Sequence, residues 1–521
     1  MLTVVLVMSL NLGSILANAA SIHGSRTALL SASDTWTYAA ADGEARRFAA
    51  ALLAAGIQPG DRIGLMAPNS PHFTLAYYGA LYAGATVVTL NTLQSAAEVA
   101  FQLADCGATA LVLHADCSDA GLPAFETADR CRLLYHLGQS ANAWPTGTMS
   151  LEDALATEDM AEVYAGMPDD TAVIQYTSGT TGQPKGAELT HFNLYCNAQY
   201  VSERAFSIWP ETINLLGPGH VGLAALPLYH TFGQTNVQNG MLFNGGAISY
   251  LSRFDPLAAV EAMARDRVTF FPAVPTMYFA ILHDERTQSA DLSRLRYCVS
   301  GGAPIPVEVK RRFEDQFAVR IQEGYGLTET SPLASCQRID ETHKCGTIGK
   351  PIAGVEFRIV DENDRDVPPG ERGEIVIRGP NIMKGYYGQP EATAHALRGG
   401  WFHSGDIGYI DGDGDVVIVD RKKDMILRGG YNVYPREIEE VLYTHPAVRE
   451  AAVIGIPDER YGEEVKAVIS LKPKCVATSE EVITFCKQHV AAYKYPRVVE
   501  ILDDLPKGPT GKLLKRALRP S

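Results

Sequence analysis

A stretch rich in glycine and hydroxyl residues, residues 177–186, constrains the fold of this chain most strongly. It reads Thr-Ser-Gly-Thr-Thr-Gly-Gln-Pro-Lys-Gly and follows an apolar run at residues 172–176, which predicts a buried strand. Glycine lets the backbone approach a ligand and direct successive N–H groups at it, while hydroxyls and Lys185 add donors and positive charge. Composition alone also fits a solvated turn. The combination nevertheless favours a polyphosphate site, with a helix predicted to begin near His191.

The stretch is not a Walker P-loop, because Lys185 is followed by glycine and alanine instead of serine or threonine. Over its ten positions it resembles the signature loop of the adenylate-forming superfamily: acyl-CoA synthetases, aryl-CoA ligases, luciferases and peptide-synthetase adenylation domains. In that family the loop holds the β- and γ-phosphates of ATP. The resemblance covers almost the whole chain and implies nucleotide contacts from Thr177, Ser178, Gly179, Thr180, Thr181, Gly182 and Lys185.

Length and composition exclude several other classes of protein. A chain of 521 residues with 46% hydrophobic and 20% charged residues is ordinary for a large globular protein of two or more domains. The net charge of −15 argues against a nucleic-acid partner and, more weakly, against attraction to anionic membranes. The nine cysteines contain no Cys-x-x-Cys pair, so we expect reduced core thiols and no disulfide framework or zinc site.

The N-terminus is apolar, but it lacks the basic segment of a secretion signal, since the first basic residue is Arg26. Leu12, Ile15, Leu16 and Ala19 recur at helical spacing and predict an amphipathic surface helix. Polar residues interrupt the apolar run well before the roughly 20 residues that a membrane span requires. We therefore expect a cytoplasmic protein, with Met8 as an alternative start.

From residue 60 onward, short apolar runs alternate with longer amphipathic stretches. Strands are predicted at residues 62–67, 85–90, 108–113, 221–227, 247–251, 268–272, 295–300 and 320–323. Such alternation indicates right-handed βαβ units in mainly parallel sheets. The pattern changes near residue 355, where strands at 355–360 and 373–378 are joined by turns rich in proline and glycine and indicate an antiparallel β unit.

The Asp-Gly-Asp-Gly-Asp run at residues 411–415 resembles half a calcium loop. Lys422 stands where such a loop needs its last glutamate, so a hairpin turn between residues 409–410 and 416–419 is the better interpretation. Five charged residues then follow at 420–424 and predict a linker. The predicted fold is α/β: an N-terminal domain at 1–420 with parallel sheets and a β unit, a hinge at 421–424, and a small mobile α+β C-terminal domain at 425–521.

Two further loops follow predicted strands, and ligands bind at the carboxyl ends of strands in such sheets. Gly324, Tyr325 and Gly326 are followed by Thr328 and Glu329. Tyr325 offers a flat face for a purine, and Glu329 offers the hard oxygen that Mg²⁺ prefers. The resemblance makes this the adenine and magnesium motif, with Thr328 near the adenylate phosphate. In the family, the segment that here contains Gly301, Gly302 and Ala303 lines both adenine and the acyl pocket.

The resemblance assigns further residues to the nucleotide and to coenzyme A. Asp406 corresponds to the aspartate that binds the ribose hydroxyls, and Arg421 to a second ribose or phosphate contact. Gly429, Gly430 and Tyr431 match the loop that closes over the thiolation tunnel. The segments 373–374 and 383–386 also match the family, and we interpret both as structural turns.

His230 follows a predicted strand, where a lone histidine is more often a packing residue. The family's matching histidine gates the carboxylate pocket, so the resemblance assigns His230 a catalytic role. Domains that activate α-amino acids carry an aspartate at the position of Thr231, and its absence argues against an amino-acid substrate. The expected pocket residues are neutral: Tyr229, His230, Phe232, Gln234, Val274 and Gly302.

The segment Leu-Pro-Lys-Gly-Pro-Thr-Gly-Lys at residues 505–512 resembles the catalytic-lysine loop of the family, which makes Lys512 the lysine. Gly508 departs from the usual threonine without moving the lysine. Lys423 occupies the family's hinge position. Both residues would otherwise be interpreted as ordinary solvated lysines.

The resemblance therefore implies an ATP-dependent acyl-CoA ligase that uses Mg²⁺ and coenzyme A. The expected substrate is a medium- or long-chain fatty acid, with an aryl acid of the 4-coumarate type as an alternative. A ligase that loads acyl groups onto a carrier protein is a further alternative, and a non-catalytic sensor is disfavoured because binding alone would not need Lys512. The expected partners are the small-molecule acid, ATP and coenzyme A, and we expect no integral membrane segment. Peripheral contact with a membrane stays open, and the protein could be a monomer or a homodimer.

Overall fold

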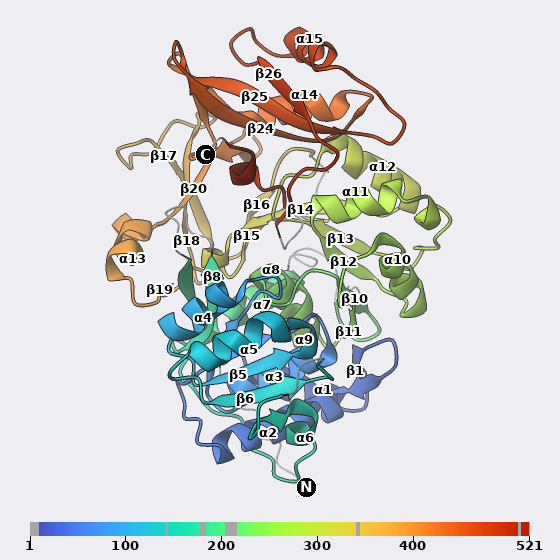
Figure 1. The fold of residues 1–521 in the computed structure, drawn as a ribbon, viewed down its shortest axis with the longest axis vertical. Helices are drawn as coiled ribbons and strands as arrows, with labels where there is room; N and C mark the ends of the chain where they lie inside the picture. The colour runs from blue at the N-terminus through green and yellow to red at the C-terminus, as the bar shows by residue number, and fades with distance from the viewer. Residues whose placement is uncertain are drawn as a thin grey trace.

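The structure is a computed structural model that describes residues 10–140, 144–177, 184–203, 216–339, 344–508 and 512–519. Two large mixed sheets with helices between and around them form most of the molecule, and the C-terminal region lies at one end (Figure 1). The predicted α/β class is confirmed. The principal helices are α1 (Ser14–His23), α2 (Tyr38–Ala54), α3 (Pro71–Tyr82), α4 (Ala96–Asp105), α5 (Ser118–Thr127), α6 (Leu151–Leu155), α7 (His191–Glu203), α8 (Thr231–Gly233), α9 (Gly240–Asn244), α10 (Pro256–Arg265), α11 (Pro275–His283), α12 (Val307–Phe317), α13 (Pro390–Ala396), α14 (Pro435–Thr444) and α15 (Ser479–His489).

The eight-stranded sheet carries the glycine-rich stretch. Its order is β19 (Gly385–Tyr386), β9 (Lys185–Thr190), β8 (Thr171–Thr177), β4 (Thr86–Thr89), β3 (Arg62–Met66), β5 (Ala110–His114), β6 (Leu133–Leu137) and β7 (Met149–Ser150). The strands from β8 to β7 run parallel, as predicted. The glycine-rich stretch, however, connects β8 to the antiparallel strand β9, with Thr177 opposite Lys185. Strands β8 and β9 therefore form a hairpin, and α7 begins directly after β9 at His191, where the sequence predicts a helix start.

The nine-stranded sheet contains the other predicted parallel strands. Its order is β16 (Lys350–Pro351), β15 (Leu333–Cys336), β14 (Ile321–Gly326), β13 (Tyr297–Ser300), β12 (Phe270–Ala273), β10 (Val221–Ala224), β11 (Ala247–Tyr250), β1 (Thr27–Leu30) and β2 (Thr35–Thr37). The run from β14 to β1 is parallel. Because β13 and β14 are neighbours, the loops that leave their carboxyl ends lie side by side.

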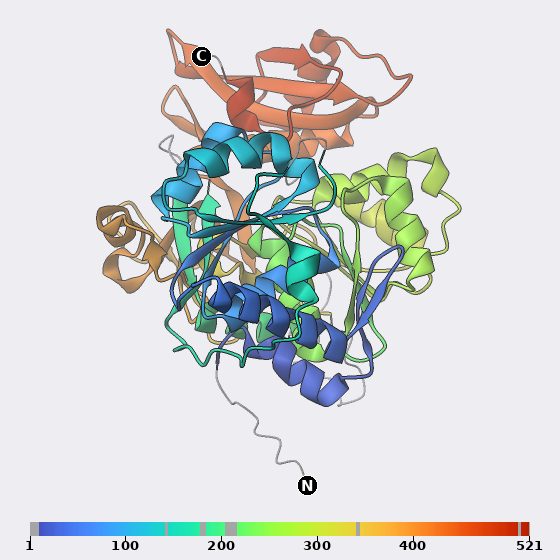
Figure 2. The ribbon, with the colours of Figure 1, turned by 60° about the horizontal axis from the view of Figure 1, so that its bottom comes forward.

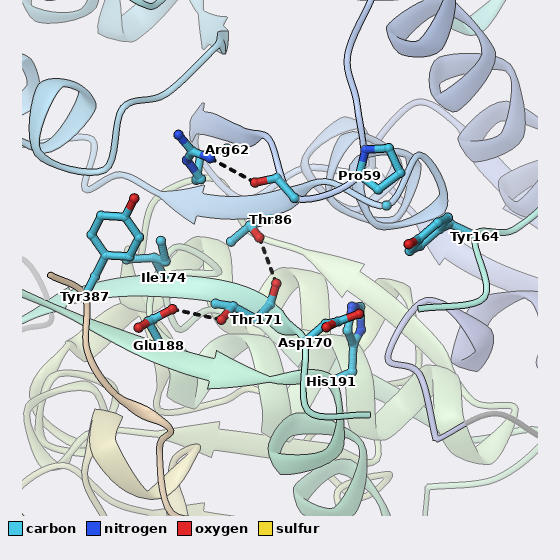
Figure 3. Close-up of a pocket in the computed structure, with 12 residues that line it drawn as sticks. Pro59, Arg62, Thr86, Tyr164, Asp170, Thr171, Ile174, Glu188, His191 and Tyr387 are labelled. Atoms are coloured by element: carbon cyan, nitrogen blue, oxygen red, sulfur yellow. Dashed lines mark hydrogen bonds between the residues drawn. The ribbon is translucent and has the colours of Figure 1, made fainter. Parts of the chain in front are cut away.

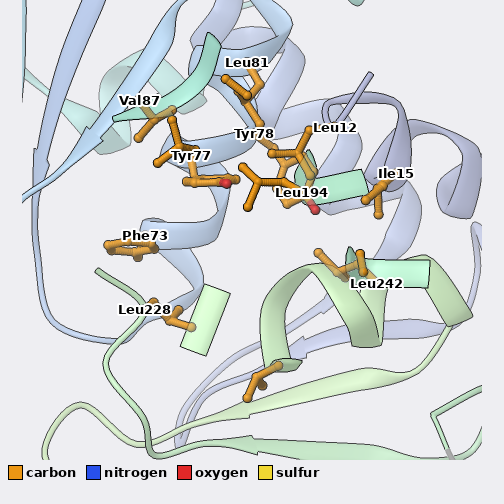
Figure 4. Close-up of a cluster of buried hydrophobic side chains, with 14 of the residues drawn as sticks. Leu12, Ile15, Phe73, Tyr77, Tyr78, Leu81, Val87, Leu194, Leu228 and Leu242 are labelled. Atoms are coloured by element: carbon orange, nitrogen blue, oxygen red, sulfur yellow. The ribbon is translucent and has the colours of Figure 1, made fainter. Parts of the chain in front are cut away.

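The main hydrophobic core surrounds α3. Eleven of the twelve residues of this helix are buried, as expected for a helix that is covered on all sides. Its side chains Phe73, Tyr77, Tyr78 and Leu81 lie in one cluster with Leu12, Ile15, Leu194, Leu228 and Leu242 (Figure 4). The predicted N-terminal helix is thus confirmed as α1, and its apolar face packs into this core.

The β unit predicted after residue 355 is a four-stranded antiparallel sheet. Its order is β17 (Glu356–Val360), β18 (Gly373–Arg378), β20 (Phe402–Ile410) and β21 (Val416–Arg421). The hairpin between β20 and β21 confirms the interpretation of residues 411–415 as a turn, in which Asp411 Oδ1 accepts hydrogen bonds from the Asp413 and Asp415 N–H groups. The interpretation of residues 373–374 and 383–386 as turns is wrong, because residues 373–374 begin β18 and residues 385–386 form β19.

The C-terminal region has its own sheet and its own core (Figures 1 and 2). Its strands are β22 (Ile426–Arg428), β23 (Tyr431–Val433), β24 (Val448–Asp458), β25 (Gly462–Leu471) and β26 (Val498–Ile501), covered by α14 and α15. Polar contacts join the region to the rest of the chain. The Arg436 N–H donates to Asp420 Oδ2 at 3.0 Å, and Arg372 Nη2 lies 3.2 Å from Glu437 Oε1.

Two expectations from composition can be compared with the fold. None of the nine cysteines is in a disulfide, and seven of them are buried. Within the described ranges, we find no helix long and apolar enough to cross a membrane.

Two isoleucines of α1 test the packing of this helix. Ile15 is 2% exposed and Ile22 is 67% exposed. We expect Ile15→Ala to destabilise the fold by about 2–5 kcal/mol, because the substitution leaves a cavity in a packed core. The thermal midpoint from calorimetry measures the loss. Ile22→Ala is the matched control and should leave that midpoint almost unchanged; equal midpoints for both variants would contradict the docking of α1.

Candidate active site

The predicted site loops leave the carboxyl ends of three strands. β8 ends at Thr177, β13 ends at Ser300, and β14 ends at Gly326. Residues Ser178, Gly179, Thr180, Thr181 and Gly182 lie outside the described residues. Thr177 and Lys185 are described at the two ends of the hairpin, where the Thr177 hydroxyl donates to the Lys185 carbonyl at 3.4 Å. The β8–β9 register therefore places the two ends of this stretch, Thr177 and Lys185, opposite one another.

The buried carboxylate of Asp406 forms the centre of a polar cluster. Its Oδ2 accepts a hydrogen bond from the Tyr325 hydroxyl at 2.6 Å, and Arg421 Nε lies 3.3 Å from its Oδ1. Asp406 and Arg421 are direct partners across β20 and β21. Burial raises the pKa of the Asp406 carboxyl, and the positive charge of Arg421 opposes that shift. The cluster brings together three residues from separate sequence motifs, and it offers both a carboxylate and a guanidinium to a ligand.

Glu329 and Lys185 approach the same tyrosine from two sides. Glu329 lies in the 3₁₀ turn Thr328–Thr330 directly after β14, and its Oε1 accepts a hydrogen bond from the Tyr386 hydroxyl at 2.9 Å. The Lys185 ammonium lies 5.1 Å from the centre of the Tyr386 ring. Burial raises the pKa of Glu329, and hydrogen bonds from its own backbone and from Tyr386 oppose that shift. Thr328, in the same turn, is buried.

Lys512 lies against the loop that follows β13, although more than two hundred residues separate them in sequence. A Cβ atom at Gly302 would be 2.7 Å from Lys512 Cε and 3.1 Å from Nζ, and Gly302 has a φ of +81°. The φ value favours glycine at 302, and the end of the Lys512 side chain occupies the space beside it. Burial, with a smaller contribution from Arg421, lowers the pKa of Lys512 to about 8. Gly301 and the exposed Ala303 flank this contact.

His230 precedes α8 and faces the charge of Lys512. Burial, together with Lys512, lowers the pKa of His230 to about 3, so the ring is neutral at physiological pH. Its Nδ1 accepts a hydrogen bond from the Phe232 N–H at 3.2 Å. A neutral imidazole that accepts at Nδ1 carries its proton on Nε2. His230 therefore offers one N–H donor to an anionic ligand.

The expected pocket residues divide into two groups. Phe232 Cζ lies 3.1 Å from the Cβ position of Gly301, and Val274 Cγ1 lies 3.6 Å from that of Gly302, so both border the loop that Lys512 approaches. Gln234 belongs to a buried network instead, in which its Nε2 donates to Thr89 Oγ1 at 3.2 Å. Tyr229 is buried, and its carbonyl accepts a hydrogen bond from Thr89.

The segment that contains Gly429, Gly430 and Tyr431 is the turn between β22 and β23. Its contacts are to its own region: the Gly429 N–H donates to the Tyr461 carbonyl at 2.8 Å, and the Tyr431 ring stacks on Tyr493 at 4.8 Å. Tyr431 is 59% exposed. The structure thus brings Lys512 to the site and leaves the β22–β23 turn at the surface.

A separate cavity of about 340 Å³ lies at the opposite, amino-terminal ends of β3, β4 and β8 (Figure 3). Its polar groups bind one another: the Thr86 hydroxyl donates to the Thr171 carbonyl at 2.8 Å, and the Thr171 hydroxyl donates to Glu188 Oε1 at 2.9 Å. None of the predicted site residues that the structure describes lines this cavity. It is therefore not the candidate active site.

Sequence reasoning missed Tyr386, which contacts both Lys185 and Glu329. The segment at 383–386 matched the superfamily, but glycine and its neighbours in a short polar stretch indicate a turn. The signal that could have found it is the pairing of β19 with β9, which a single sequence does not reveal.

Comparison with known families and proteins identifies the fold. Residues 16–387 match the AMP-binding enzyme family, and residues 437–512 match the AMP-binding enzyme C-terminal domain. The long-chain-fatty-acid–CoA ligase of Bacillus subtilis (strain 168) is 36% identical over 535 residues, which cover 97% of this chain and 94% of that protein. Feruloyl-CoA synthase of an Amycolatopsis species is 38% identical over 509 residues, which cover 98% of each chain.

Solved structures show the same relationship. ATP-bound MatB from Rhodopseudomonas palustris superposes with a TM-score of 0.88 at 33% identity and 98% coverage of both chains. A benzoate CoA ligase from Burkholderia xenovorans LB400 gives a TM-score of 0.88 at 30% identity, covering 98% of this chain and 100% of that one. Because the first family match spans more than half of the chain and the relatives match almost its full length, this chain belongs to the AMP-binding enzyme family.

Proposed function

We propose that the protein is an ATP-dependent acyl-CoA ligase that activates a fatty acid as an acyl-adenylate and then transfers the acyl group to coenzyme A. The observation that carries this proposal is the position of Lys512, which reaches from the C-terminal region to Gly302 and His230. A partly buried ammonium at the carboxyl ends of the strands is placed to stabilise charge on a phosphate and a carboxylate. Preorganised charge of this kind is a main source of catalysis in phosphoryl-type transfer.

The nucleotide contacts follow from the two polar clusters. Asp406 is suited to accept hydrogen bonds from the ribose hydroxyls, and Arg421 beside it is suited to a ribose or phosphate oxygen. Tyr325, Gly324, Gly326 and the loop at 301–303 would border adenine. Lys185 and the hairpin end would hold the β- and γ-phosphates, as the resemblance implies.

The site fits Mg²⁺ only together with the nucleotide. The Glu329 carboxylate uses Oε1 for Tyr386 and retains further acceptor sites. In the part of the chain that the structure describes, no group of three or more His, Cys, Asp or Glu side chains could hold a metal ion alone. Mg²⁺ is commonly held by one or two carboxylates plus phosphate oxygens. Glu329 would therefore hold the ion, which supplies positive charge against the phosphates when bound.

The second half-reaction requires a different face of the C-terminal region. We place the domains at 1–420 and 425–521, with a hinge at 421–424 that contains Lys423. The end of β21 at Arg421 and the start of β22 at Ile426 support this placement. Rotation about Lys423 would withdraw Lys512 and bring Gly429, Gly430 and Tyr431 toward the site, as a lid motion that serves two steps in one cleft.

The substrate class rests on the neutral pocket. Thr231 stands at the position where an acid would hold an amino group, and Phe232 and Val274 border the loop at 301–302. Relatives named for long-chain fatty acids and for feruloyl groups match equally well, so an aryl acid is a second candidate. The match to feruloyl-CoA synthase is the observation that favours the aryl-acid candidate.

A panel of acids tests the substrate class. We expect octanoate or palmitate to support pyrophosphate release, with acyl-CoA formed when coenzyme A is added, because the pocket wall is neutral. The measurement is pyrophosphate release with octanoate, palmitate, 4-coumarate and several amino acids, each with and without coenzyme A. Preference for 4-coumarate would select the aryl-acid candidate. Turnover that depends only on an amino acid would refute the proposal, and acyl-adenylate without thioester would indicate a carrier-protein acceptor.

Lys512→Ala separates the two half-reactions. We expect acyl-adenylate formation to slow by about 10²–10³-fold, the scale of losing one preorganised charge partner. The same variant supplied with synthetic acyl-adenylate should form acyl-CoA at the normal rate, because the rotated domain has withdrawn Lys512. Single-turnover kinetics measure each step, with Lys474→Ala as an exposed-lysine control. Equal impairment of both steps would contradict the alternating mechanism.

The pKa of Lys512 predicts a pH dependence. The lysine acts as a cation, so its contribution is present below its pKa of about 8 and is lost as the pH rises through that value. We expect kcat/KM for ATP in acyl-adenylate formation to fall above pH 8, because this ratio reports groups of the free enzyme. The facing charged groups are Arg421 and Asp406. A basic limb that persists unchanged in Lys512→Ala would assign it to another group.

A further inference from the structure

The segment around β19 connects two parts of the candidate nucleotide site: the β8–β9 hairpin, which contains Lys185, and the turn that contains Glu329. The backbone of this segment is hydrogen-bonded to both parts: the Met383 N–H donates to the Glu329 carbonyl at 2.9 Å, and the Tyr387 N–H donates to the Gly186 carbonyl at 2.7 Å. Between these bonds, Tyr386 lies opposite Ala187 in the β9–β19 ladder. The side chain of Tyr386 therefore starts from a backbone position that is tied to both the phosphate-side hairpin and the Glu329 turn.

The orientation of Tyr386 is also held from behind. Its own N–H donates to Thr393 Oγ1 at 2.8 Å, and a Cβ atom on the preceding Gly385 would lie 2.7 Å from Thr393 Cγ2. Helix α13, which contains Thr393, thus packs against the backbone on which Tyr386 stands. A tyrosine that merely filled space at a surface turn would not need this support.

The two polar contacts of Tyr386 are made to groups of opposite charge. Its hydroxyl donates to the Glu329 carboxylate, and the face of its ring receives the Lys185 ammonium. Among the described residues, Lys185 and Glu329 form no ion pair with one another. A direct pair would neutralise both groups. A cation over an aromatic face keeps its charge and its N–H donors, and a carboxylate with one hydrogen bond keeps acceptor sites.

We propose that Tyr386 is a positioning residue that keeps Lys185 and Glu329 apart and aligned, so that one can bind phosphate oxygens and the other the divalent cation that accompanies them. This inference rests on the proposed adenylation function, in which Glu329 is the metal ligand. In this role Tyr386 acts through the two charged groups that its side chain contacts.

Measuring nucleotide affinity with and without Mg²⁺ distinguishes a positioning role of Tyr386 from a general role of this residue in the fold. The dissociation constant of the non-hydrolysable analogue α,β-methylene-ATP is measured by calorimetry in the absence and in the presence of Mg²⁺. Tyr386→Phe removes the hydroxyl and keeps the ring for Lys185. In the wild type, Mg²⁺ should lower the dissociation constant of the analogue by some factor, and we expect this factor to be about tenfold smaller in Tyr386→Phe, the scale of a hydrogen bond to a charged group. The dissociation constant without Mg²⁺ should be unchanged.

Two further variants give the matched comparisons. Tyr386→Leu removes the ring as well, so its affinity should fall also without Mg²⁺. Tyr387→Phe removes the hydroxyl of the adjacent tyrosine and should behave as the wild type. In the background of Glu329→Gln, Tyr386→Phe should have no further effect on the Mg²⁺ response, because the hydroxyl acts through that carboxylate.

Each result decides the proposal. An unaltered Mg²⁺ response in Tyr386→Phe, an equal loss with and without Mg²⁺, or additive losses in the double variant would overturn the positioning role. If Glu329→Gln keeps the full Mg²⁺ response while the wild type activates acids, the metal assignment is wrong and the positioning inference falls with it. Failure of the wild type to release pyrophosphate with any acid would instead refute the proposed function.

Discussion

The buried carboxylate of Asp406 is the interaction on which the arrangement of the site depends. It accepts a hydrogen bond from Tyr325 of the nine-stranded sheet and pairs with Arg421 across the four-stranded sheet. A carboxylate that is 4% exposed would be costly without such partners. Because each partner belongs to a different element, satisfying this one charge fixes how the two sheets meet. The register of β20 and β21 is thus linked to the end of β14, where the ligand would bind.

Positive charge is concentrated around this carboxylate at a cost to the fold. Lys512 has an ordinary pKa of 10.5 that burial and Arg421 lower to about 8. The folded state therefore holds the lysine's proton less tightly than the unfolded chain does. At neutral pH this unfavourable contribution is on the order of 3 kcal/mol, and it diminishes as the pH rises from about 8 toward the unfolded value. An anionic ligand would relieve it, so the same feature that weakens the empty protein favours binding of a triphosphate.

The sequence predicted the parts of the fold that depend on local pattern. Continuous apolar runs such as residues 108–113 became central parallel strands, because burial on both faces leaves a clear signal. β9 and β19 were missed, because β19 is a two-residue strand at the edge of its sheet and the mixed polarity of β9 gives no clear pattern without its partners. The motifs supplied the candidate site residues except Tyr386, whose position depends on the pairing of residues about two hundred positions apart. The division of the expected pocket, with Gln234 drawn into a buried network, likewise depends on tertiary contacts.

Several contacts between the C-terminal region and the rest of the chain are polar, and contacts of this kind can break and form again in another arrangement. Arg436 binds Asp420, and Arg372 binds Glu437 while its guanidinium lies 4.9 Å from the centre of the Tyr434 ring. These are polar pairs, whereas the C-terminal region keeps a hydrophobic core of its own. An interface of this kind can separate without exposing a large apolar surface. In the proposed mechanism, Lys512 beside Gly302 and the β22–β23 turn at the surface would correspond to two orientations of one rigid region, each presenting a different set of residues to the same cleft.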